Sequence, residues 1–136
     1  MRAVLDPNVL IAAVLSRRGA PAELVLRAFA GEFELVVSAL LLAELEQALG
    51  YPKLSRRISP SDAAEFVDLL RTAGLLVPDP ATAPRRSSDP GDDYLLALAE
   101  TAGAHLVSGD HHLLELADRF PIVNARAFLD TLEQRR

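Results

Sequence analysis

The sequence contains no cysteine and no tryptophan. The absence of cysteine excludes disulfide scaffolds, thiolate zinc sites and cysteine nucleophiles. No apolar run approaches the roughly 20 residues that a membrane span requires. The start of the chain has no basic region followed by a long apolar stretch, so we expect no signal peptide. These absences favour a cytoplasmic protein that makes no contact with a membrane.

Lysine is also scarce, because Lys53 is the only lysine among 14 basic residues. The formal net charge of −5 argues against a generic basic nucleic-acid binder. Local phosphate contacts stay open, since the arginine fork matches phosphate oxygens well. The alternative is that these arginines are solvated loop residues. The candidates for substrate contact are Arg17, Arg18, Arg85 and Arg86.

Short β-forming segments alternate with helical ones along the 136 residues. We expect strands at 2–5, 33–37, 75–77, 105–108 and 122–123. We expect helices at 8–15, 21–30, 39–49, 60–73, 92–102 and 111–118, and a last one capped by Asn124. Residues 78–91 hold four prolines and predict a loop. The alternation predicts an α/β fold: a single three-layer α/β/α domain over 1–136 with a short-stranded, mostly parallel central sheet.

Two acids stand where predicted strands end. Asp6 follows the apolar segment 3–5, and Asp110 follows 105–108. Ligands of open parallel sheets bind outside the carboxyl ends of the strands, where the strand order reverses. The alternative is that each aspartate only caps a turn or the next helix. Two such acids at two strand ends favour a shared cation, if they converge.

Helical periodicity selects two more acids. Glu44 falls within the apolar arc of the helix at 39–49, whereas Glu46 falls outside it. Asp92 lies on the same side of its helix as the apolar stripe, and Asp93 lies off that stripe. We therefore expect Glu44 and Asp92 to point inward, and Asp93 to face outward or toward a supporting position. The alternatives are a solvent-reaching edge glutamate and simple capping acids.

The four selected acids are Asp6, Glu44, Asp92 and Asp110. An all-oxygen set without cysteine or dispersed histidines suits Mg²⁺ or Mn²⁺. Such an ion meets substrate phosphates and supports phosphodiester cleavage.

The whole chain resembles PIN-domain proteins, most of all the toxin components of toxin–antitoxin systems. The resemblance rests on the segments 6–11, 31–38, Glu44-Leu45 followed by 52–54, 89–93 and 106–110. It implies a Mg²⁺- or Mn²⁺-dependent endoribonuclease that is usually dimeric and is held silent by an antitoxin. The catalytic acids of the family fall on Asp6, Glu44, Asp92 and Asp110, with the metal held by Asp6, Asp92 and Asp110. Its supporting residues fall on Asn8, Ser108 and Asp93.

The chain departs from the family pattern at three positions. Pro7 replaces a threonine, Gly91 stands where an acid is common, and His112 stands where many members have a second aspartate. The change at His112 affects the expected binding of a second metal ion more than that of the first. His111 and His112 can instead contact substrate phosphate, or form the solvated first turn of a helix.

Two other enzyme classes share the fold and an acid cluster. A receiver-type phosphorylation domain needs a lysine at a late strand end, and Lys53 lies between two helices instead. A haloacid-dehalogenase-like phosphatase needs a second aspartate two residues after the first, where this chain has Asn8. A binding module with a degenerate acidic site stays open as the alternative to an active nuclease.

Overall fold

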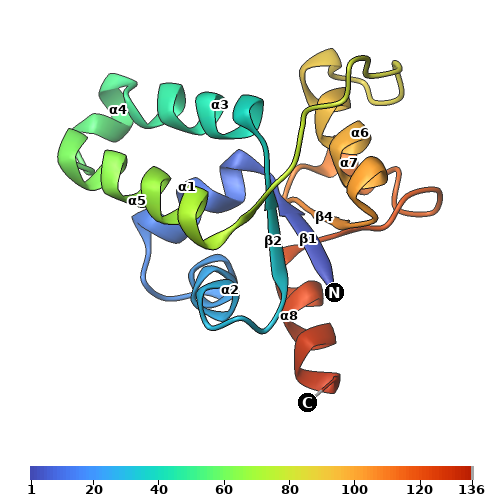
Figure 1. Cartoon of the computed structure of the whole chain (residues 1–136), viewed down its shortest axis with the longest axis horizontal. Coiled ribbons are helices and arrows are strands. Elements are labelled where there is room, and N and C mark those ends of the chain that lie inside the picture. Colours follow the sequence, from blue (N-terminus) through green and yellow to red (C-terminus); the bar gives the residue numbers. More distant parts are fainter. Residues whose placement is uncertain (136) are drawn as a thin grey trace.

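A computed structural model describes residues 1–135 and places five strands in one sheet. The strand order is β3-β2-β1-β4-β5, and every neighbouring pair is parallel. Figure 1 shows the short strands at the centre with helices around them. The strands are β1 (Arg2–Leu5), β2 (Glu34–Val37), β3 (Leu75–Leu76), β4 (His105–Val107) and β5 (Ile122–Val123). The predicted parallel α/β fold is confirmed, and the sheet is wholly parallel.

Helices cover both faces of this sheet. Successive residues of a strand point to opposite faces, and Ala3, Val4 and Leu5 of β1 all have no solvent exposure. The helices are α1 (Pro7–Leu15), α2 (Ala20–Phe29), α3 (Ala39–Leu49), α4 (Pro52–Ser55), α5 (Pro60–Ala73), α6 (Asp93–Ala102), α7 (His111–Leu114) and α8 (Ala125–Gln134). Near-continuous burial on both faces is typical of parallel sheets and explains why the strands are apolar after their first residue.

Besides one-residue shifts at the ends of α1 and α2, three helical segments differ from the sequence prediction. The one-turn helix α4 was not expected, and it begins where Pro52 occupies the first helical position. Helix α7 ends at Leu114 rather than at 118, because Leu116 and Ala117 donate to carbonyls three residues back and tighten the chain into turns. A 3₁₀ turn, η1 (Pro90–Asp92), precedes α6, which therefore begins one residue later than expected.

The strand order reverses between β1 and β4. From β1 the chain moves outward through β2 to β3, and then returns to the other side of β1 to form β4. The carboxyl ends of β1 and β4 are joined by the bond from the Asp6 N–H to the Val107 carbonyl, at 2.9 Å. A ligand site is therefore expected at this edge of the sheet. Within residues 1–135, no helix has the length and apolar character of a membrane span.

Candidate metal centre

Three polar residues at the carboxyl ends of β1 and β4 form one hydrogen-bonded chain. The Ser108 hydroxyl donates to Asp6 Oδ2 at 2.8 Å and accepts the Asp110 backbone N–H at 3.0 Å. Asp6 Oδ1 accepts the N–H of Asn8 at 3.0 Å and so caps α1. Each carboxylate oxygen of Asp6 keeps a second lone pair for a further partner. Capping and ion binding are therefore compatible at Asp6.

A cleft of about 250 Å³ opens beside this chain of bonds. Its lining includes Asp6 at the end of β1, Glu44 from α3, and Asp92 from the turn before α6. Asn8 and Leu95 also line the cleft. Acids that are 38 and 48 residues apart in the sequence thus meet in one cavity. The prediction that Asp92 lies on the Leu95 side of its helix agrees with this placement.

Asp92 carries the clearest electrostatic signature of the site. Its Oδ2 is buried and has no hydrogen-bond partner among residues 1–135. Burial raises the pKa of the Asp92 carboxyl to about 6, and the negative charges of Asp6, Asp89, Asp110 and Glu44 add to the effect. A buried oxygen without a donor is costly unless a cation or proton meets it.

Asp6 and Asp110 belong to the same electrostatic group. Burial raises the pKa of Asp6, and the nearby charge of Asp110 raises it further, whereas hydrogen bonds from Asn8 and Ser108 lower it. Within residues 1–135 no arginine or lysine forms an ion pair with Asp6, Glu44, Asp92 or Asp110. The negative charge of the cluster is therefore uncompensated by the protein itself.

Tyr94 is a residue of this site that the sequence reading missed. Its hydroxyl donates to Glu44 Oε2 at 2.7 Å and so joins α6 to α3 across the cleft. Burial and the Glu44 carboxylate both raise the pKa of Tyr94, which keeps the hydroxyl protonated as a donor. A tyrosine in an Ala/Leu-rich helix was the available signal, since buried tyrosine hydroxyls normally find a partner. Its partner on α3 could not be read from one sequence.

Asp93 does not face outward, and that part of the prediction is wrong. The residue is 1% exposed, and its Oδ1 accepts the Ser87 N–H, the Ser87 hydroxyl and the Arg86 N–H at 2.8, 2.8 and 3.1 Å. These bonds lower the pKa of Asp93. The 78–91 loop covers the face of α6 that periodicity assigned to solvent. Asp93 therefore anchors the loop that leads into Asp92.

The basic candidates are distributed unequally around the cleft. Arg17 and Arg18 lie beyond the far end of α1, about 13 Å of helix away from Asp6. Arg85 is exposed and lies 3.4 Å from Asp93. Arg86 is already engaged, since its Nη1 donates to both carboxylate oxygens of Glu100 at 2.9 Å. None of these four arginines lines the acidic cleft.

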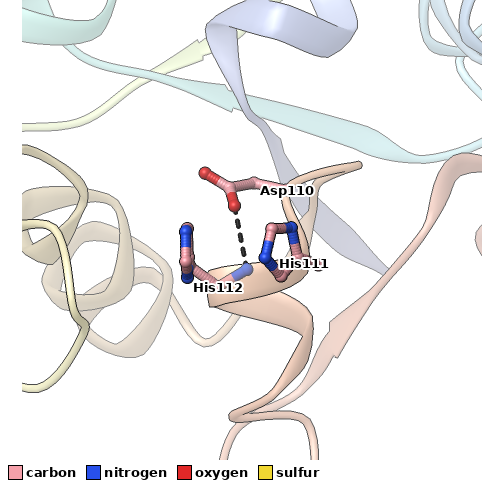
Figure 2. Close-up of side chains that lie close together, drawn as sticks. All are labelled: Asp110, His111 and His112. Carbon is pink, nitrogen blue, oxygen red and sulfur yellow. Dashed lines mark hydrogen bonds between the residues drawn. The ribbon is translucent and has the colours of Figure 1, made fainter.

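His111 and His112 lie at the start of α7, directly after Asp110. Both histidine side chains are exposed, and Asp110 Oδ1 accepts the His112 N–H at 2.9 Å. Figure 2 shows the three side chains lying close together. Asp110 does not line the acidic cleft itself; it lines an adjoining, larger cleft of about 410 Å³, and Asn8 lines both. The two histidines are thus accessible neighbours of the acidic cluster.

The donor set of the cleft fits a hard divalent cation. Its ligands are carboxylate oxygens, with one buried oxygen unpartnered and no basic side chain in place to neutralise them. Mg²⁺ and Mn²⁺ are bound by one or a few carboxylates and retain sites for water and phosphate.

Comparison with known proteins agrees with this geometry. The sequence pattern of the PIN domain family matches residues 2–112. The chain belongs to the PIN domain family. The match includes all four acids of the cluster, and it confirms the resemblance drawn from the sequence segments.

Two crystal structures show that the PIN fold extends over nearly the whole chain. PAE2754 from Pyrobaculum aerophilum superposes with a TM-score of 0.67 at 18% identity, over 98% of this chain and 90% of that one. VapBC2 from Rickettsia felis, bound to a DNA fragment from its promoter, gives a TM-score of 0.62 at 16% identity, over 91% and 98%. No curated protein sequence matches the chain.

Proposed function

We propose that this PIN domain is an endoribonuclease that hydrolyses RNA phosphodiester bonds in the acidic cleft with Mg²⁺ or Mn²⁺. The observation that carries the proposal is the buried, unpartnered Asp92 Oδ2 among carboxylates that no basic side chain neutralises. An arrangement that only stabilised the fold would pair or bury these charges with donors. A cation-binding site leaves them free.

Asp6, Asp92 and Asp110 are the residues that would hold the ion. When bound, a divalent ion activates water and stabilises the charge that develops on the phosphate. Ser108 sets the spacing of Asp6 and Asp110, because its hydroxyl bonds to both residues. Asp93 fixes the loop that presents Asp92. The chain therefore holds its three ligands from three separate elements.

Glu44 stands on the α3 wall of the cleft and is assigned a proton-handling role. Tyr94 occupies its Oε2, which leaves Oε1 able to accept a proton from an attacking water. Asn8 lines both clefts and offers an amide that can donate to a phosphate oxygen. His111, His112 and the exposed Arg85 are the remaining candidates for contacts with the RNA backbone.

The products distinguish this mechanism from attack by the ribose 2′-hydroxyl. Cleavage of a single-stranded RNA should require Mg²⁺ or Mn²⁺, stop in EDTA, and leave 5′-phosphate and 3′-hydroxyl ends. Asp6→Asn should abolish it. Cyclic-phosphate ends, or full activity in EDTA, would instead indicate chemistry by the histidine pair. A protein that binds RNA and the ion without cleaving would be the binding-module alternative.

We further propose that the chain acts as the toxin of a toxin–antitoxin pair and forms a homodimer. The fold likeness to VapBC2 supports this assignment. Exposed apolar side chains are available for partners, among them Leu26 at 61% and Leu76 at 57% exposure. Sedimentation equilibrium at tens of micromolar should give twice 14.7 kDa. A single species of 14.7 kDa would contradict the dimer.

A further inference from the structure

The start of α7 holds a second set of metal-ligating atoms that differs in chemistry from the acidic cleft. One ligand atom each from Asp110, His111 and His112 lies within 4.8 Å of the other two. The two imidazole rings lie 4.1 Å apart and are tilted by 37°. Figure 2 shows the Asp110 carboxylate beside the two rings, on the same side of the start of α7.

These spacings are close to those that one ion requires. Metal–nitrogen and metal–oxygen distances of about 2.0 to 2.2 Å place neighbouring ligand atoms about 3 to 4 Å apart. The side chains of His111 and His112 are both exposed, so their rotation can bring the ring nitrogens to these distances. Asp110 is held in place, because its Oδ1 accepts the His112 N–H at 2.9 Å. Its Oδ2 has no hydrogen bond within residues 1–135.

We propose that Asp110, His111 and His112 form a binding site for a borderline transition ion of the Zn²⁺ class. Two imidazoles and one carboxylate suit Zn²⁺, Co²⁺ or Ni²⁺, whereas Mg²⁺ prefers oxygen ligands only. Three protein ligands leave a further position for water, as in open zinc sites. The acidic cleft would thus select Mg²⁺ or Mn²⁺ by its carboxylates, and the start of α7 would select a Zn²⁺-class ion by its two imidazoles.

Asp110 is common to both sites, which couples them. Its charge acts on both Asp6 and Asp92, so an ion held at Asp110 changes the field of the acidic cleft. We therefore expect Zn²⁺ to suppress Mg²⁺-dependent cleavage. This regulatory part rests on the proposed nuclease function, whereas the binding part does not.

Binding is tested on the untagged, chelator-treated full chain without RNA. Calorimetry should show one Zn²⁺ per chain, and His111→Ala or His112→Ala should weaken it at least about 10-fold, the lower bound for loss of a supporting group. Glu115→Ala, an exposed acid one turn away, should bind as the wild type does. Asp6→Asn and Asp92→Asn should also retain Zn²⁺.

The third histidine provides an internal control for nuclear magnetic resonance. His105 lies on β4, where its ring packs 5.6 Å from Phe128, so its imidazole signals should not move with Zn²⁺. The signals of His111 and His112 should move with Zn²⁺ and not with Mg²⁺. The site is refuted if Zn²⁺ does not bind, or if it shifts the signals of His105 alone. It is also refuted if Asp92→Asn loses Zn²⁺ binding while His111→Ala and His112→Ala keep it.

The coupling between the two sites is then measured within each protein, as the ratio of the cleavage rate with Zn²⁺ to the rate without it at fixed Mg²⁺. The ratio should be well below one for the wild type and return toward one in His111→Ala. An equal ratio in both proteins would overturn the coupling and leave the binding result intact. Absence of cleavage in Mg²⁺ alone would refute the nuclease, not the zinc site.

Discussion

The variants Asp92→Asn and Asp93→Asn should change the stability of the fold in opposite directions. The two acids are adjacent in the chain, and the same substitution removes one charge from each with little change in size. Asp92 turns into the acidic cleft, where Oδ2 has no partner. Asp93 turns into the 78–91 loop, where Oδ1 accepts three hydrogen bonds. Because both acids stand at the start of α6, an effect on helix capping alone would be similar in the two variants.

The charge of Asp92 destabilises the folded state. Its pKa moves from 3.8 to about 6, which corresponds to about 3 kcal/mol against the charged form. Because the side chain is partly exposed, we discount this to about 1 to 2 kcal/mol. The folded state holds the Asp92 proton more tightly than the unfolded state, so the cost is absent below about pH 4 and complete above about pH 7. Asp92→Asn removes it.

The charge of Asp93 has the opposite effect. Its pKa is lowered, because the hydrogen bonds from Ser87 and Arg86 outweigh the cost of burial. Hydrogen bonds to a charged group are worth about 1.5 to 3 kcal/mol, against about 1 kcal/mol for neutral ones. Asp93→Asn weakens three of them and leaves an amide against the Arg85 guanidinium. We expect a loss of about 1 to 3 kcal/mol at neutral pH.

Chemical denaturation at two pH values measures both effects without a metal ion. At about pH 7.5, Asp92→Asn should raise the unfolding free energy and Asp93→Asn should lower it; at about pH 4 the gain of Asp92→Asn should disappear. Changes of the same sign, or a gain for Asp92→Asn that does not depend on pH, would refute the electrostatic reasoning. Asp92→Asn should also abolish cleavage.

Three further predictions follow from individual contacts. Tyr94→Phe should lower the rate of cleavage at saturating Mg²⁺ and shift its pH profile, because Glu44 loses its 2.7 Å bond. Tyr51→Phe, in the same cleft, should do neither, and an equal effect would assign Tyr94 to packing alone. Gly74→Ala should cost about 1 to 3 kcal/mol in denaturation, because its Cβ would lie 2.6 Å from a carbonyl oxygen of α5, whereas Gly109→Ala meets open space and should be nearly neutral. Mg²⁺ at about 100 times its Kd should stabilise the wild type by about 2.7 kcal/mol, and an equal gain in a variant without the cleft acids would place the ion elsewhere.

Much of the fold could be predicted from the helix-capping residues and the hydrophobic periodicity of the sequence. Ser38 and Asn124 cap helices as expected, with bonds to the N–H groups of Leu41 and Ala127. Asp6 and Asp110 could be placed together because parallel strands bring their carboxyl ends to one edge. These inferences succeed because they depend on local backbone geometry and on the topology of a parallel sheet.

The missed features depend on contacts between distant segments. Periodicity treats a helix as having one buried and one exposed face, but α6 lies between the sheet and the 78–91 loop, so Asp93 is buried as well. On α3, helical spacing puts Leu40 in the same apolar arc as Glu44, yet Leu40 is 43% exposed while Leu42 is buried. The bond from Tyr94 to Glu44 links helices 50 residues apart. Nothing within one helix specifies such a partner.

The central claim is that the carboxylates at the ends of β1 and β4 and before α6 hold one divalent ion for phosphodiester cleavage. The most direct measurement is an anomalous difference map from crystals of the chain soaked in Mn²⁺. The account predicts a strong peak in the cleft, within coordination distance of Asp6 and Asp92 and absent from Asp92→Asn crystals. A cleft without a peak, or a single peak at the histidines of α7 alone, would contradict it.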